Sequence, residues 1–202
     1  MRATDKSLVG MFGERVSLRN IPEVPGSMHR PSVRVRTPEL SPLPFPSLLC
    51  PMDAIIIVDL QKAFPVPPEL VRKIEERSRD FPLRVFTKFL NEPDSLFCRK
   101  LERTSCLPGT AERELLIDPR EGDIVLDKRG YGLTAEQIEQ LRAAGINKAL
   151  VCGVDTDACV LGVVFTLFDA GIDCEVESQL CWSSTGLHHE ALTIVREQFG
   201  TG

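Results

Sequence analysis

The sequence predicts an α/β protein with three layers, in which a mainly parallel, doubly wound sheet lies between helices on its two faces. Two observations support this prediction. Short runs of branched apolar residues recur between residues 53 and 176, and a continuous run of this kind is typical of a strand buried on both faces. Stretches with helical spacing or helix-start patterns lie between the runs, and such alternation favours parallel strands with helical crossovers.

Five strands are expected in this Rossmann-like arrangement. The first is a continuous β-branched run that ends in an acid, and the others are shorter runs of branched and small apolar residues. Their expected ranges are Asp53–Asp59, Leu83–Lys88, Asp123–Lys128, Lys148–Gly153 and Ile172–Val176. The crossovers between parallel strands should be right-handed. Ligands of such sheets bind at the carboxyl ends of the strands, near the point where the strand order reverses.

Two helices are expected before the fourth strand. Residues 69–79 are polar, with apolar residues at helical spacing. Thr134 and Gln137 form a capping box, because the threonine can accept from the third helical amide while the glutamine reaches back. This second helix should turn Ile138, Leu141 and Ala144 inward and end at Gly145. Residues 91–119 should be irregular.

Two further helices are expected toward the C-terminus. The stretch from Asp157 to Ala170 has an almost wholly apolar middle, which indicates burial on most sides. A last helix is expected over Leu187–Gln198, with Ser184 or Thr185 as its cap.

The first 51 residues differ in composition from the rest of the chain. They hold seven Lys and Arg against four Asp and Glu, a net charge of +3, and eight of the 15 prolines. Residues 52–202 hold 17 against 25, a net charge of −8. We therefore expect one domain at 52–202 after a disordered extension at 1–51. The extension is either a real tail that binds a partner or the result of a mis-assigned start, with translation beginning at Met52; the second interpretation is favoured.

Composition and charge exclude several classes of protein. A net charge of −5 gives no general attraction to nucleic acid or anionic lipid. No stretch is long enough to span a bilayer, and the N-terminus lacks a secretory signal. Seven cysteines without framework spacing are typical of a reducing cytoplasm. Cys152 and Cys174 are expected in the core, and Cys50, Cys98, Cys106 and Cys181 in loops or at the surface.

Polar residues follow three of the expected strands. Asp59 ends the first strand, Lys128 ends the third, and the segment from Gly153 to Cys159 follows the fourth. One cleft can hold all of them, because the carboxyl ends of parallel strands meet at one edge. Lys128 and the helix N-terminus should lower the pKa of Cys159, and Asp59 can exchange its proton. A carboxylate, an ammonium and a thiol together indicate a nucleophile site.

The same residues resemble a known family. Asp59-Leu-Gln-Lys-Ala-Phe64, Lys128 and Val151-Cys-Gly-Val-Asp-Thr-Asp-Ala-Cys-Val160 look like the three signature stretches of the isochorismatase-like cysteine hydrolases. Order, spacing and strand placement match, and the resemblance covers about residues 53–199.

The resemblance implies specific roles. Asp59, Lys128 and Cys159 would form the catalytic triad, and the backbone amides of Asp155 and Cys159 would form an oxyanion hole. A non-proline cis peptide is implied at Val154–Asp155. Phe64 matches an aromatic residue that packs on substrate. Tyr131 is a further candidate for substrate binding, although a position facing water is an equal alternative.

The implied reaction is hydrolysis of a C–N bond in a small amide, ureide or carbamoyl compound through a Cys159 thioester. Metal-binding nicotinamidases of the family carry an Asp-x-His pair and a further histidine, but this sequence has no histidine between Leu60 and Leu187. No metal and no cofactor are therefore expected, and nicotinamide is disfavoured as a substrate.

Asp155 departs from the family pattern, which has a small apolar residue there. Its carboxylate would oppose an oxyanion unless it points away. The alternative function is therefore a non-catalytic binding or oligomerisation module. A thiol redox sensor is a third hypothesis, but the motif offers no resolving cysteine. The apolar helix after Cys159 suggests a homo-oligomer, and the expected partner is a small-molecule substrate.

Overall fold

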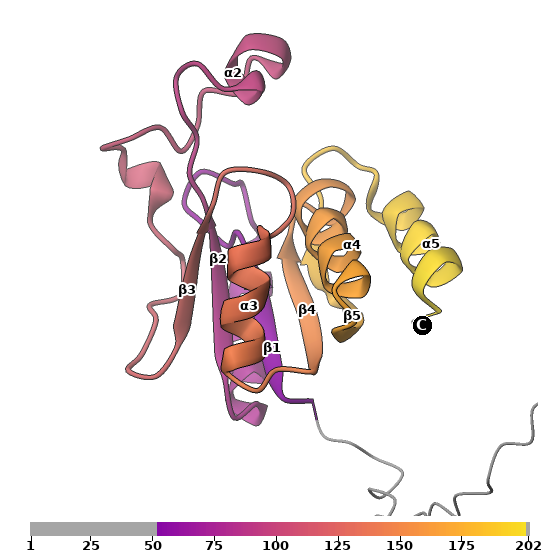
Figure 1. The fold of residues 1–202 in the computed structure, drawn as a ribbon. Coiled ribbons are helices and arrows are strands. Elements are labelled where there is room, and N and C mark those ends of the chain that lie inside the picture. The colour runs from indigo at the N-terminus through magenta and orange to yellow at the C-terminus, as the bar shows by residue number, and fades with distance from the viewer. Residues whose placement is uncertain (1–51, 201–202) are drawn as a thin grey trace, which may run out of the picture. The chain divides into compact units, whose positions relative to one another are not determined.

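A computed structural model describes residues 52–200 of the chain, and these residues form one five-stranded sheet flanked by helices (Figure 1). All neighbouring strands are parallel, and their order is β3-β2-β1-β4-β5. The strands are β1 (Ala54–Val58), β2 (Arg84–Phe89), β3 (Ile124–Lys128), β4 (Lys148–Val154) and β5 (Asp173–Trp182). This arrangement confirms the predicted α/β class and the doubly wound, parallel sheet.

The apolar runs of the sequence become the central strands. All five residues of β1 are buried, as expected of a strand with neighbours on both edges and helices on both faces. β5 extends six residues beyond the expected end at Val176. Its pairing with β4 shifts register between Val151 and Gly153, and such an irregularity lets a strand continue past a bend.

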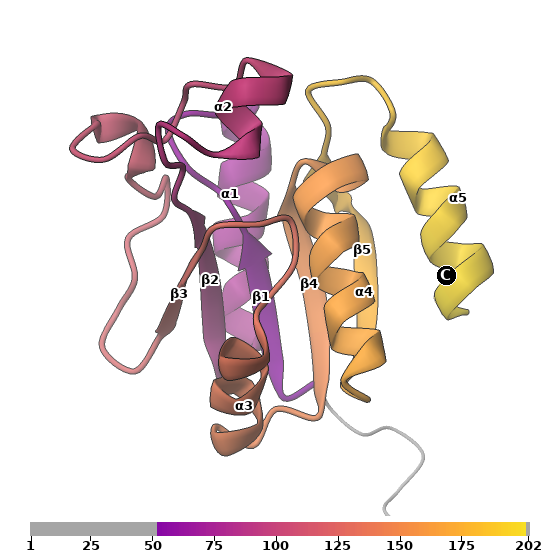
Figure 2. The same cartoon turned by 45° about the horizontal axis from the view of Figure 1, so that its top comes forward.

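The helices cover both faces of the sheet. Helix α1 (Pro68–Arg77) lies on one face, and α3 (Ala135–Ala143) and α4 (Leu161–Asp169) lie on the other (Figure 2). Helix α5 (His188–Phe199) packs against α4, where the ring of Phe199 meets those of Phe165 and Phe168 edge to face. The region expected to be irregular contains the short helix α2 (Leu96–Leu101).

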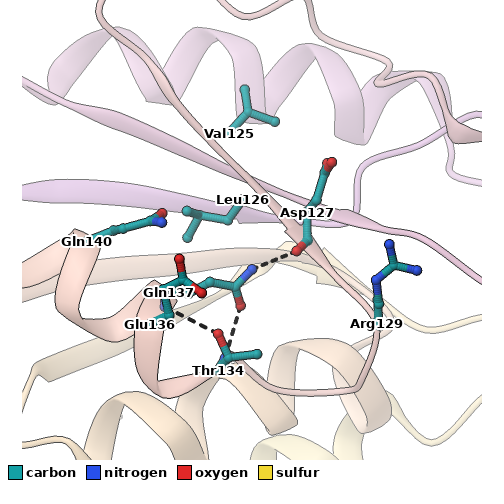
Figure 3. A pocket seen from close by; sticks show the side chains of 8 residues that line it. All are labelled: Val125, Leu126, Asp127, Arg129, Thr134, Glu136, Gln137 and Gln140. Atoms are coloured by element: carbon teal, nitrogen blue, oxygen red, sulfur yellow. Dashed lines mark hydrogen bonds between the residues drawn. The ribbon is translucent and has the colours of Figure 1, made fainter.

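The predicted capping box at the start of α3 is confirmed and connects this helix to β3. The Thr134 amide donates to Gln137 Oε1 at 3.0 Å, and the Gln137 amide donates to Thr134 Oγ1 at 3.3 Å. The Gln137 side-chain amide also donates to the carbonyl of Asp127 at 2.7 Å (Figure 3). The backbone just before Lys128 is therefore anchored to the helix. A surface cavity of about 400 Å³ beside these residues contains none of Asp59, Lys128 and Cys159.

Several local predictions were wrong. Ala144 is exposed because α3 ends before it. Phe165 and Phe168 of α4 are also exposed, so this apolar helix is not buried on most sides. Helix α5 begins after Leu187 without a side-chain cap. Ser184 Oγ donates to Asp155, and Thr185 Oγ1 donates to Asp157 and accepts from the amide of Leu187, which precedes the helix.

Of the cysteines expected in loops or at the surface, Cys106 lies in a loop but is buried, and Cys98 lies in α2 and is half-buried. The prediction was wrong for Cys181, which is buried in β5. Cys152 and Cys174 are buried as expected.

The expected extension at residues 1–51 lies outside the described residues, as does Cys50. Within residues 52–200, no helix combines the length and the apolar character that a membrane crossing requires.

Candidate active site

Three segments of the chain bring Asp59, Lys128 and Cys159 together at the carboxyl edge of the sheet. Asp59 follows β1 and Cys159 follows β4, and the strand order reverses between these two neighbours. Lys128 is the last residue of β3, two strands from β1, so its long side chain reaches across β2. Asp59 and Lys128 are almost fully buried, and Cys159 is 8% exposed.

The carboxylate of Asp59 is fixed from two sides. Its Oδ1 accepts a hydrogen bond from Thr87 Oγ1 at 2.6 Å, and its Oδ2 lies 2.7 Å from Lys128 Nζ. Oδ2 makes no well-aligned hydrogen bond within the described chain, so its contact with the ammonium is an ion pair. The residue itself has a positive φ of 47°, which turns the chain away from the strand. One carboxylate oxygen is thus held by the hydroxyl while the other stays available for a proton.

Lys128 is positioned by its own loop and by an aromatic ring. Its ammonium donates to the Gly130 carbonyl at 2.9 Å and lies 5.4 Å from the centre of the Phe89 ring. Burial lowers the pKa of Lys128, but its interactions with Asp59 first and with Cys159 second outweigh this effect, and the net direction is upward. The side chain is therefore a permanent cation at neutral pH.

Cys159 lies in a π-helical turn, Thr156–Val160, that directly precedes α4. Burial and the Asp59 carboxylate raise the pKa of its thiol, while Lys128 lowers it, and the net direction is strongly upward. The expected lowering by Lys128 is present, but it does not decide the outcome. In the free protein Cys159 is therefore a neutral thiol that needs a base to become a nucleophile.

The side chain of Asp155 is engaged by the segment that follows β5. Its Oδ1 accepts from the Ser184 amide and its Oδ2 from Ser184 Oγ, both at 2.9 Å. The peptide bond before it, Val154–Asp155, is cis. The backbone amide of Asp155 donates to no acceptor among residues 52–200. The amide is thus available for a ligand while the carboxylate is occupied.

The next two residues of the turn contact the same segment. Thr156 Oγ1 lies 2.8 Å from His188 Nδ1. The Asp157 carboxylate accepts a hydrogen bond from Ser183 Oγ and another, at 2.7 Å, from Thr185 Oγ1. Burial raises the pKa of Asp157, but these two hydroxyls outweigh it and the net direction is downward. Three consecutive residues before the nucleophile are therefore held by residues 183–188.

Tyr131 and Phe64, the expected substrate-binding residues, have different surroundings. Tyr131 is 39% exposed and meets Phe97 edge to face, and Phe97 meets Phe89, which faces Lys128. Phe64 is half-buried in the loop after β1, where its amide donates to the Gln61 carbonyl at 3.1 Å. The structure places Tyr131 in an aromatic chain that leads to Lys128; the role of Phe64 stays a prediction.

Tyr131 borders two cavities of about 340 Å³ each. One is almost wholly apolar and lies against α2. The other lies against the start of α4 and against the turn Thr156–Val160, which carries Cys159 and is called the nucleophile turn below. Its lining also includes Arg103, Asp157 and Ala158. The second cavity is therefore the one whose lining includes sequence neighbours of Cys159.

Sequence reasoning missed three residues that support the site, namely Thr87, Ser184 and Gln61. The Gln61 side chain donates to the carbonyls of Phe89 and Arg113, both at 3.1 Å, and accepts from the Phe89 amide at 2.8 Å. It thereby ties the loop after β1 to the end of β2 and to residue 113. Its position two residues after Asp59 in the motif was the only pattern that pointed to it.

The comparisons with known proteins agree with the fold and with the family that the sequence resembles. A model of the Isochorismatase domain family matches residues 53–201. This chain belongs to the isochorismatase family. Members of this family are hydrolases, and the match spans the whole described sheet. A search among curated proteins gave no match.

Solved structures share the fold of this isochorismatase-family chain at low sequence identity. A pyrazinamidase of Pyrococcus horikoshii, in complex with zinc, is 21% identical, with a TM-score of 0.67 over 74% of this chain and 97% of that one. An N-carbamoylsarcosine amidase from Thermoplasma acidophilum is 22% identical, with a TM-score of 0.64 over 74% and 94%. A nicotinamidase from Bacillus subtilis is 19% identical, with a TM-score of 0.62 over 74% and 97%.

The zinc in the pyrazinamidase structure raises the question of whether this chain could hold a metal in the same way. Residues 52–200 contain no group of three or more His, Cys, Asp or Glu side chains placed to hold a metal ion. The sequence has no histidine from 61 to 187. Because imidazole and thiolate are the ligands that zinc prefers, this donor set does not fit a zinc site beside Asp59.

Proposed function

We propose that this protein is a cysteine hydrolase that cleaves a C–N bond of a small amide, ureide or carbamoyl substrate. The observation that carries the proposal is the buried cluster at the carboxyl edge of the sheet. There the Asp59–Lys128 ion pair, at 2.7 Å, lies close enough to the Cys159 thiol to act on its titration. Burying an ion pair costs desolvation free energy, and a pair beside a nucleophile can serve catalysis in return.

The first half-reaction begins with the neutral thiol. The sulfur of Cys159 attacks the carbonyl carbon and its proton passes to Asp59 Oδ2, the oxygen without a well-aligned hydrogen bond. Lys128 stays charged and stabilises both the carboxylate and the developing negative charge on sulfur. The C–N bond then breaks, and Asp59 returns the proton to the nitrogen that leaves as ammonia or an amine. The product of this step is a Cys159 thioester.

The second half-reaction releases the acid. Water gives a proton to Asp59, the resulting hydroxide adds to the thioester carbon, the C–S bond breaks and the thiol regains its proton. In both halves the oxygen of the carbonyl becomes negatively charged. The amides of Asp155 and Cys159 are the proposed donors to this oxygen, and each such donor contributes roughly 3–4 kcal/mol to lowering the barrier.

The surroundings of the cluster favour a small substrate. The cavity against the nucleophile turn measures about 340 Å³, which is near the lower end for small-molecule sites. Its lining includes Tyr131 and Arg103 and none of Asp59, Lys128 and Cys159, and it reaches the cluster through Asp157 and Ala158, which precede Cys159. An aromatic face and a cation suit a planar amide or ureide that carries a polar or anionic group. N-carbamoylsarcosine, the compound after which the amidase from Thermoplasma acidophilum is named, has these properties.

The test is release of ammonia from a panel of carboxamides, ureides and carbamoyl amino acids. The expected result is turnover of at least one member, abolished by Cys159→Ala. Cys98→Ala is the matched control, because Cys98 is a partly exposed thiol outside the cluster. Mass spectrometry of a rapidly quenched reaction should show an acyl adduct on the peptide that contains Cys159.

No turnover across the panel, together with tight binding of one member, would overturn the proposal in favour of a binding module. The carboxylate of Asp155 is the feature that suggests this alternative. The bonds from Ser184 to both carboxylate oxygens weaken this argument, because they occupy the charge that would have opposed the oxyanion.

A further inference from the structure

Asp155 brings a negative charge to the place where the proposed reaction develops another one. Its backbone amide is a proposed donor to the oxyanion. The carboxylate therefore belongs to the same residue as a group that would contact the reacting oxygen. The side chain is only 5% exposed, and water therefore screens the charge poorly. A carboxylate in this position must be both compensated and turned away for the oxyanion hole to work.

Ser184 meets both requirements. Its amide and its hydroxyl each donate to a different oxygen of the Asp155 carboxylate, both at 2.9 Å. Two hydrogen bonds from one residue fix the plane of the carboxylate as well as its direction. Hydrogen bonds to an ionised acceptor are also stronger than those between neutral groups.

The neighbouring hydroxyls do not share this task. Ser183 and Thr185 both donate to Asp157, the other carboxylate of the turn. Each acid of the nucleophile turn therefore has its own donors in the segment after β5. Removing the hydroxyl of Ser184 changes the partners of Asp155 alone, and removing that of Ser183 changes those of Asp157.

We propose that Ser184 is a positioning residue of the hydrolase, which holds the Asp155 carboxylate away from the oxyanion hole formed by the amide of the same residue. This inference rests on the proposed function for its effect on turnover. Its effect on the Cys159 thiol follows from electrostatics alone and needs no substrate.

The first experiment measures turnover in Ser184→Ala. We expect kcat to fall about tenfold while KM changes by less than about twofold, because the carboxylate keeps only its bond from the Ser184 amide and its uncompensated oxygen opposes charge that exists only in the transition state. The double variant Ser184→Ala/Asp155→Asn should recover most of the loss, because the amide carries no charge. Ser183→Ala should show a smaller loss of kcat, and Asp155→Asn should not restore it.

The second experiment uses iodoacetamide and follows alkylation of Cys159 by peptide mass spectrometry between pH 7 and 11. In Ser184→Ala the pH profile should move upward by about one pH unit, because a carboxylate that has lost one of its two donors disfavours the thiolate. Adding Asp155→Asn should reverse the shift. A structural role of Ser184 in the loop would give no such reversal.

The two readouts separate the possible failures. If no substrate turns over but the alkylation profile shifts and is reversed as described, the positioning role holds and the proposed function fails. Wild-type kcat in Ser184→Ala, or a double variant as impaired as the single one in both assays, would overturn the role of Ser184.

Discussion

The hydroxyl of Thr87 donates a hydrogen bond to Asp59 Oδ1 at 2.6 Å and accepts one from the Asp59 amide at 3.1 Å. Thr87 lies on β2, between the strand that precedes Asp59 and the strand that ends with Lys128. Because the hydroxyl holds Oδ1, the carboxylate presents Oδ2 to the ammonium of Lys128. A single threonine on the intervening strand thus sets the direction of the proposed base.

Thr87→Val tests this relationship. Valine has nearly the same shape but no hydroxyl, so Asp59 Oδ1 loses its donor and remains buried. We expect kcat to fall about tenfold and stability to fall by about 1–2 kcal/mol, the cost of an unpaired buried acceptor. Thr110→Val, at an exposed position, is the control and should leave both unchanged. The measurements are ammonia release and urea unfolding, and wild-type kcat in Thr87→Val would show that Lys128 alone orients Asp59.

Opposite effects of Lys128 and Asp59 on the Cys159 thiol give a second prediction. Burial and Asp59 raise the pKa of this thiol, and Lys128 lowers it. Lys128→Met should therefore raise the thiol pKa further and slow alkylation at pH 9, whereas Asp59→Asn should lower the pKa and speed alkylation. Both variants should lose turnover, since one lacks the cation and the other the base.

Residue-resolved mass spectrometry is needed for this measurement, because Cys98 is more exposed than Cys159 and will react as well. Lys88→Met, on β2 and outside the ion pair, is the control for loss of a lysine and should leave the alkylation of Cys159 at the wild-type rate. Alkylation that changes in the same direction in Lys128→Met and Asp59→Asn would contradict the electrostatic account.

The ion pair between Arg84 and Asp123 predicts how stability depends on pH. The side chains of Arg84 and Asp123 are only 5% and 9% exposed, and Arg84 Nε donates to Asp123 Oδ1 at 3.0 Å. Burial raises the pKa of Asp123, but its bonds to Arg84 and to the Arg120 amide outweigh this, and the net direction is downward. The pair therefore stabilises the fold above the pKa of an unfolded Asp, about 3.9, and this contribution is lost as pH falls through the lower folded value.

Asp123→Asn should cost about 3 kcal/mol at pH 7, because the Arg84 charge is left buried without its partner. The difference from wild type should shrink as pH falls below 4. Asp80→Asn, which removes an exposed pair with Arg77, should cost less than about 1 kcal/mol. Unfolding by urea at pH 3 and pH 7 gives both values, and a difference between wild type and Asp123→Asn that is independent of pH would be against the prediction.

The sequence predicted the sheet and the cluster because both depend on local patterns. The branched run of β1 and the capping box at Thr134 act within a few residues, and parallel strand ends bring Asp59, Lys128 and Cys159 to one edge. Thr87 and Ser184 could not be predicted in the same way. Their hydrogen bonds join residues 28 and 29 positions apart, and they depend on strand register and on the path of the loop after β5.

The helix α4 shows a further limit of prediction from sequence. Its apolar run indicated burial on most sides, but the sheet covers one face and α5 covers part of another, which leaves Phe165 and Phe168 exposed. The pKa of Cys159 was predicted in the wrong direction for a similar reason. The favourable charge of Lys128 was visible in the motif, but the depth of burial was not.

Gly153 provides the last prediction, because its backbone lies directly against Val58 of β1. Its φ is +118°, and a Cβ atom there would lie 2.2 Å from the carbonyl oxygen of Val58. Gly153→Ala should therefore destabilise the fold by more than about 3 kcal/mol and displace Asp59, which directly follows Val58. Gly122→Ala has a similarly positive φ of +91° but open space around its Cβ, so it should cost only about 1–2 kcal/mol. Thermal unfolding of the two variants separates steric overlap from backbone conformation. Equal losses in Gly153→Ala and Gly122→Ala would mean that the two strands can move apart, in which case the position of Asp59 would not depend on this contact.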